Sequence, residues 1–323
     1  MTTTNLVDEQ SSNAWASLLA RLNHQSVTKH FDAYADVAWD DESFRIDPGD
    51  PVWELGADDP LAQTSWYRSL PATTRSRLGL HMIASQMKTG LQFESILKRG
   101  LLEFAAELPN QAPEFRYAYH EVIEEAQHSL MFQEFVNRAG FDVAGMPPLI
   151  KLASRRVVRL GRVFPTLFFM FVLGGEDPID HVQRETLRST HDVHPLLERI
   201  MRIHVTEEAR HLSFARHYLE KNVPALSRRQ RRALALQTPF ILGLMSQLML
   251  RPSPQIVKTY GIPKAVLREA FSQNPAHHAA VRDSLRKVRR LADDLGLVTT
   301  VSRPIWKAFG IWDADNGSLA TIG

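Results

Sequence analysis

Cysteine is absent from all 323 residues of the chain. Its absence excludes disulfides, iron–sulfur clusters, zinc–thiolate sites and cysteine nucleophiles, so any bound metal ion must have His, Asp or Glu as its ligands. An excess of charge of one sign is also lacking, because 38 Lys and Arg face 36 Asp and Glu. The basic runs 155–162 and 228–232 lack interleaved aromatics and are typical of solvated helix faces. We therefore expect no nucleic-acid partner.

Long apolar runs are lacking as well. The longest, residues 163–175 and 239–250, are shorter than the roughly 20 residues that span a bilayer, and each contains a proline. Near the N-terminus, no basic stretch is followed by an apolar one, which is the pattern of a secretion signal. We therefore expect no membrane span and a cytoplasmic location.

Strand-like alternation is also absent, and apolar residues recur at helical spacing over most of the chain. The pattern predicts a polar tail over 1–13, a short helix over 14–22 and an irregular segment, rich in Asp, Pro and Trp, over 31–70. Helices are predicted over residues 73–108, 113–139, 149–160, 195–222, 228–250 (kinked near Pro239), 263–273 and 276–295, with Asp192 as the N-cap before Pro195. The helix over 149–160 leads to the apolar run at Phe164, which continues to about residue 189. The expected fold is all-α, with residues 1–70 packed on a helical domain of residues 71–323.

Two Glu-x-x-His pairs are the strongest chemical signal. They are Glu125 with His128, and Glu208 with His211. Residues three apart on a helix share a face, so each pair can bind one metal ion through a carboxylate and an imidazole. Di-iron carboxylate bundles contain two such pairs and one further Glu from each of two other helices. The two pairs therefore predict a ferritin-like bundle with a di-metal site.

Each further glutamate should lie on the helix before its Glu-x-x-His pair, at the same distance along the helix axis from the turn that connects the two helices. Glu94 lies 14 residues before Leu108, about 21 Å, and Glu125 lies 12 residues after Pro113, about 18 Å. Glu176 is 14 residues before residue 190, about 21 Å, and Glu208 is 13 residues after residue 195, about 20 Å. Glu103 and Glu185 lie too close to these turns. We therefore predict Glu94 and Glu176 as ligands.

A third histidine shares the face of the second pair. His204 precedes Glu208 by four residues and His211 by seven, so it is a candidate seventh ligand. Carboxylates and imidazoles suit iron or manganese. Pro178, two residues after Glu176, is expected to disturb its helix.

This pattern resembles the p-aminobenzoate N-oxygenase family of di-iron enzymes. The resemblance is in the order and approximate spacing of the ligand types: Glu94, Glu125-x-x-His128, Glu176 and His204-x-x-x-Glu208-x-x-His211. It covers roughly residues 70–250 and implies a ferritin-like helical bundle, a homodimer, two iron ions, an external electron donor and O2-dependent oxidation of an amine to hydroxylamine and nitro products. It further implies that Glu125 and Glu208 bridge the irons, that Glu94 and His128 serve one iron, and that the other has Glu176, His204 and His211.

The substrate is expected to be a small molecule that binds beside the metal ions. Gly90, Leu91, Leu97 and Val172 are candidates to line its pocket. An aryl acid would need a cation for its carboxylate, and Lys88 is the only basic residue just before Glu94.

Three other readings are open at this point. Another di-iron oxidase, such as a fatty-acyl desaturase or hydroxylase, shares six of the ligands. A radical-generating subunit like that of ribonucleotide reductase needs a tyrosine near the metals, and Tyr117 and Tyr119 precede Glu125. A non-catalytic iron-binding protein of the ferritin type would use the same pairs without a substrate.

Overall fold

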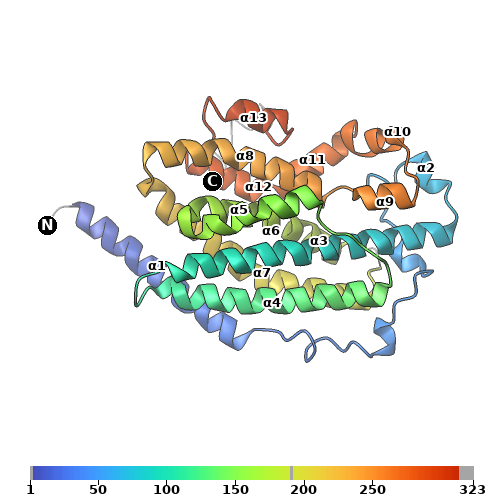
Figure 1. Cartoon of the computed structure of the whole chain (residues 1–323), viewed down its shortest axis with the longest axis horizontal. Helices are drawn as coiled ribbons and strands as arrows, with labels where there is room; N and C mark the ends of the chain where they lie inside the picture. The colour runs from blue at the N-terminus through green and yellow to red at the C-terminus, as the bar shows by residue number, and fades with distance from the viewer. Residues whose placement is uncertain (1–2, 190–191, 313–323) are drawn as a thin grey trace.

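Two helical hairpins form the centre of the molecule. The computed structural model describes residues 3–189 and 192–312, and in these residues it has helices and turns but no strand. The hairpins are formed by α3 (Ala72–Ala106) with α4 (Pro113–Ala139) and by α6 (Pro165–Arg188) with α7 (Pro195–Asn222). Because α3 packs on α6 and α4 on α7, the four helices make one bundle along the long axis of the molecule (Figure 1). The predicted all-α, ferritin-like class is confirmed.

The ends of these helices follow local sequence signals. Gly140 ends α4 with a left-handed φ of 71°, which glycine adopts without the steric cost of a Cβ atom. Proline occupies the first position of both α4 and α7. The predicted N-cap Asp192 is wrong. Because Pro195 is the first helical residue, His194 is the cap, and its Nδ1 accepts a hydrogen bond from the Leu196 N–H at 3.3 Å.

The remaining helices connect and cover the bundle. α5 (Pro148–Val163) connects the two hairpins and packs on α3 and α6, and α8 (Arg228–Met249) packs on α6. Ser227 and Gln230 form a capping box that fixes the start of α8 where the sequence predicts it. The C-terminal part continues with α9 (Pro254–Thr259), α10 (Lys264–Leu267), a π-helical turn (Arg268–Ser272), α11 (Pro275–Ser284), α12 (Arg286–Asp294) and α13 (Arg303–Ala308).

The N-terminal part differs from its prediction. α1 (Thr3–Thr28) is a long helix, so the polar tail over residues 1–13 and the short helix over 14–22 are wrong. The irregular segment that follows is as predicted, with short turns η1 (Glu42–Phe44), η2 (Pro51–Trp53) and α2 (Ser65–Arg68). Its Trp53 is 2% exposed and stacks on His194 with ring centroids 4.4 Å apart. Tryptophan thus fixes this segment on the start of α7.

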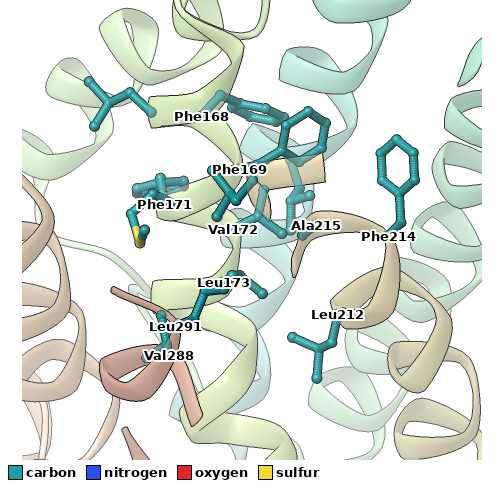
Figure 2. Close-up of a cluster of buried hydrophobic side chains, with 14 of the residues drawn as sticks. Phe168, Phe169, Phe171, Val172, Leu173, Leu212, Phe214, Ala215, Val288 and Leu291 are labelled. Carbon is teal, nitrogen blue, oxygen red and sulfur yellow. The ribbon is translucent and has the colours of Figure 1, made fainter. Parts of the chain in front are cut away.

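The largest apolar core contains side chains of all four bundle helices. Figure 2 shows side chains of α6, α7 and α12 in this core, among them Phe169, Phe214 and Val288. These three side chains are fully buried, and each such burial contributes roughly 1.5–3 kcal/mol to folding. Packing in this core holds the ligand-bearing helices α6 and α7 against each other.

One helical stretch, Arg228–Thr259, is apolar enough to cross a membrane by length and composition alone. Half of its most apolar window is buried against the rest of the chain, as in a core helix of a soluble protein, so it is weak evidence for a span.

Candidate metal centre

The seven predicted ligands meet in the interior of the bundle. Glu94 comes from α3, Glu125 and His128 from α4, Glu176 from α6, and His204, Glu208 and His211 from α7, and none is more than 3% exposed. Their possible ligand atoms lie within 4.8 Å of one another in overlapping groups: Glu94, His128 and His204; Glu125, His128 and Glu208; Glu176, His204 and Glu208; and Glu125 and His211 with Glu121. Glu94 and Glu176, which were chosen by their height above the turns, therefore lie with the two Glu-x-x-His pairs in the structure.

Individual distances show how closely the helices approach one another. His204 Nε2 lies 3.6 Å from Glu94 Oε1, which joins α7 to α3. His128 Nδ1 lies 3.4 Å from Glu125 Oε2 and 3.5 Å from Glu208 Oε1, which joins α4 to α7. His211 Nδ1 is 3.0 Å from Glu125 Oε1. All these atoms surround one small region that is closed to bulk water.

Pro178 does not interrupt the helix that carries Glu176. α6 continues through Pro178, which leaves the carbonyl of Gly174 without its usual N–H donor. The neighbouring Gly175 is needed for packing, because a Cβ atom there would collide with the ring of Phe93 on α3. Glu176 therefore keeps its helical position and points into the cluster.

Two further glutamates orient the histidines, and the sequence analysis missed them. His211 Nε2 donates to Glu124 Oε2 at 2.8 Å, and His128 Nε2 donates to Glu207 Oε2 at 2.9 Å. These bonds leave Nδ1 of each ring facing the cluster, and such partners fix the orientation of metal-binding histidines. The signal was available, because each glutamate directly precedes a predicted bridging glutamate.

The segment after α1 donates backbone hydrogen bonds to Glu207 on α7 and to Gln127 on α4. The Phe31 N–H donates to Glu207 Oε1 at 3.1 Å, and the Ala33 N–H donates to Gln127 Oε1 at 2.9 Å. Arg210 lies between both outer glutamates, with Nη2 at 2.8 Å from Glu124 Oε1 and 3.4 Å from Glu207 Oε1. The N-terminal segment is therefore part of the support of the centre.

The electrostatics of the cluster show an unbalanced negative charge. Burial raises the pKa of Glu176 well above its usual value, and the charges of Glu208 and Glu125 add to this effect. Burial opposes the charged form of His128, but Glu125 and Glu207 outweigh it and raise its pKa to about 9. Burial lowers the pKa of His204 to about 4, so this ring is neutral and free to bind a metal ion.

The residue set fits two divalent cations. Five buried carboxylates share this space with three histidines. Buried polar atoms without partners are rare in proteins. Among the described residues, six atoms of the predicted ligands lack a hydrogen-bond partner: Glu94 Oε2, both oxygens of Glu125, His128 Nδ1, His204 Nδ1 and Glu208 Oε2. Metal ions satisfy such atoms, and hard oxygen and imidazole ligands suit iron or manganese.

A cavity of about 280 Å³ adjoins one side of the centre. Glu94, Glu176 and His204 lie in its wall, which is otherwise formed mostly by apolar residues of α3, α6, α7 and the segment after α8. Of the predicted pocket residues, Gly90 lines this cavity, whereas Leu91, Leu97 and Val172 pack in the apolar cores. Ligand pockets of proteins have comparable sizes and linings.

Arg251 supplies the cation of this cavity. The expected residue, Lys88, donates to Gln133 Oε1 at 2.6 Å and does not line the cavity. Arg251, just after α8, lines it, and its guanidinium contacts the ring of Phe271 at 5.9 Å from the centroid. Burial lowers the pKa of Arg251, and in the described part of the chain no carboxylate pairs with it. No local pattern predicts this position, because Arg251 lies 157 residues after Glu94.

Known proteins are similar to the chain over nearly its whole length. The family model described as p-aminobenzoate N-oxygenase AurF matches residues 12–296. Uncharacterized proteins of Mycobacterium tuberculosis and Mycobacterium bovis are each 38% identical to the chain over 301 residues, which is 93% of this chain and 88% of the relative. No solved structure matches the chain significantly. The family match includes all four bundle helices and the segment that braces the centre.

Proposed function

Because the chain belongs to the p-aminobenzoate N-oxygenase AurF family of di-iron oxygenases, we propose that it oxidises the nitrogen of a small amine to a hydroxylamine or nitro product. The observation that carries the proposal is the group of seven buried ligands beside an apolar cavity. A closed centre that adjoins a cavity suits an oxygenase better than an iron store, because the cavity gives a substrate access to the metal ions.

We assign the ligands as the family resemblance implies. Glu125 and Glu208 would be shared by both ions, Glu94 and His128 would hold one, and Glu176, His204 and His211 would hold the other. Bound ions would supply the redox chemistry that activates O2. For a hydroxylamine product, one oxygen atom of O2 is added to the amine, and the other leaves as water with two protons and two electrons from an external donor. The native ions are iron, with manganese as the alternative.

The protein's own residues bind and orient the substrate. The apolar wall of the cavity excludes water from the amine, and Glu94, Glu176 and His204 form the part of the wall nearest the metal ions. Arg251 is always charged at physiological pH, so we assign it to an anionic group of the substrate, such as a carboxylate.

The proposed activity is tested by aerobic product analysis of the reduced, iron-loaded protein. Arylamines, alkylamines and fatty acids serve as substrates. Hydroxylamine or nitro products from an amine support the proposal. Products from fatty acids alone indicate a desaturase or hydroxylase, and iron uptake without any product indicates a non-catalytic iron protein.

The role of Arg251 is tested with matched ligands, 4-aminobenzoate and the neutral 4-aminobenzamide. Loss of a charge-assisted hydrogen bond costs roughly 1.5–3 kcal/mol, so Arg251→Gln should weaken 4-aminobenzoate binding at least about tenfold. Binding of the amide should change little. Lys88→Gln is the control, because Lys88 lies outside the cavity wall. Equal losses for both ligands would mean that Arg251 only shapes the cavity.

We also propose a cytoplasmic homodimer in which residues 1–70 and 71–323 form the two parts of each subunit. Phe240 and Leu244 of α8 are 55% and 39% exposed and offer an apolar contact. Two-fold pairing is the commonest closed assembly. Sedimentation at micromolar concentration should give about twice the chain mass of 36.7 kDa, and a monomer at every concentration would contradict the dimer.

A further inference from the structure

An eight-residue repeat relates the two ligand-bearing helices α4 and α7. Residues 121–128 read EVIEEAQH and residues 204–211 read HVTEEARH, and the two segments are identical at five of eight positions. The repeat equates Glu125 with Glu208, His128 with His211, and the outer partner Glu124 with Glu207. It also equates Glu121 with His204, the proposed seventh ligand. The repeat thus draws attention to a residue with no role so far.

The structure places Glu121 inside the centre. Its side chain is 1% exposed, and its ligand atoms lie within 4.8 Å of those of Glu125 and His211. The same relation holds on the other side, where the His204 ring lies 4.7 Å from the His128 ring and its Nε2 lies 3.8 Å from Glu208 Oε1. Each of the two residues therefore faces the histidine of the opposite helix.

No described protein group donates a hydrogen bond to Glu121, although the His211 ring and the Tyr117 hydroxyl lie close to it. Both of its carboxylate oxygens lack a hydrogen-bond partner, and so does the hydroxyl of Tyr117, one turn earlier on α4. Arg210, the nearby cation, pairs instead with Glu124 and Glu207. A buried carboxylate without a partner is costly, so Glu121 requires either a proton or a metal ion.

We propose that Glu121 is an eighth metal ligand, which binds the ion next to Glu125 and His211 as the counterpart of His204. The inference rests on the proposed di-metal centre and adds a ligand that the seven-residue pattern lacks. In the ligand assignment above, the ion next to His211 then has a ligand from both positions four residues before a shared glutamate, Glu121 and His204. The ion beside Glu121 is then bound by an additional negative charge, which favours its retention.

The test is a titration of the metal-free full-length protein with Co2+, followed by optical absorption. Glu121→Gln keeps the shape of the side chain and removes its charge, and Glu121→Ala removes both. We expect the wild type to bind two Co2+ ions, and both variants to bind one of the two at least about tenfold more weakly with altered d–d absorption bands. Glu185→Gln on the exposed surface of α6 is the matched control and should behave as the wild type.

Unchanged affinity and unchanged bands in Glu121→Gln would overturn the proposal and return Glu121 to a protonated core residue. A wild type that binds no Co2+ would overturn the di-metal centre as well. Circular dichroism and thermal unfolding of the metal-free variants control for misfolding. Because metal ions stabilise the state that binds them, the rise in Tm on Co2+ addition should also be smaller in Glu121→Gln.

Discussion

The two hairpins of the bundle provide nearly the same set of groups, yet their surroundings differ. Each contributes a lone glutamate, a Glu-x-x-His pair and an outer glutamate that orients the histidine of the other hairpin. The difference lies four residues before each bridging glutamate, where α4 has Glu121 and α7 has His204. His204 lies in the wall of the cavity, whereas Glu121 does not line the cavity and lies within the centre beside Glu125 and His211.

Both hairpins contribute candidate metal ligands, but only some of these ligands line the cavity. The cavity touches the centre only through Glu94, Glu176 and His204 among the predicted ligands of the described chain. The repeated segments thus make a nearly symmetric candidate metal centre, and only one side of it faces the cavity that we propose for the substrate. Variants of equivalent residues in the two hairpins test this division.

The largest effect is expected for the bridging glutamates. After anaerobic iron loading the wild type should contain close to two metal ions per chain, and Glu125→Ala or Glu208→Ala should lose most of them, because each carboxylate holds both ions. Metal analysis of the desalted protein measures this loss, with Glu185→Ala on the exposed face of α6 as the control. Full occupancy in both variants would contradict the di-metal reading.

A smaller and equal effect is expected for the outer glutamates. Glu124→Gln and Glu207→Gln remove the charges that orient His211 and His128, and the loss of such partners typically lowers metal affinity by about 10–100-fold. Competition with a chelator measures the affinity of both variants. If only one variant is impaired, the two hairpins are not equivalent in metal binding.

The smallest effect on metal content is expected at His204, which distinguishes the two sides of the centre. His204→Ala should keep close to two ions, because the other six proposed ligands are intact. Amine oxidation should fall at least about tenfold, or about 1.4 kcal/mol of barrier, because the variant opens the side that faces the substrate. Product formation and metal content are measured on the same sample. Unchanged oxidation and an unchanged spectrum would make His204 an ordinary core histidine.

Much of this centre was accessible from the chain alone. Helical spacing places His204, Glu208 and His211 on one face of a helix whose observed bounds, Pro195–Asn222, are those predicted. The height above the turn selected Glu94 over Glu103, and in the structure Glu94 is 2% exposed in the cluster. Both arguments use only the fixed rise and turn of an α-helix.

The errors arose where no such regularity applies. The polar composition of residues 3–13 favoured a tail, although the backbone there continues α1. Pro178 was expected to disturb α6, but the helix accommodates it where two glycines precede Glu176. Leu97 and Val172 were expected at the pocket, but their sides of α3 and α6 face the apolar core.

The sequence by itself determined the four helices and the ligand-bearing face of each, because these properties follow from the 3.6-residue period within one element. Only the tertiary structure decided which further residue joins the candidate ligands, which glutamates orient the histidines and which ligands face the cavity. The bonds of Glu124 to His211 and of Glu207 to His128 join residues 87 and 79 positions apart. Arg251 reaches the cavity from beyond the bundle. Such contacts depend on how each helix is rotated against its neighbours, and that rotation is set by the packing of the whole core rather than by any local spacing.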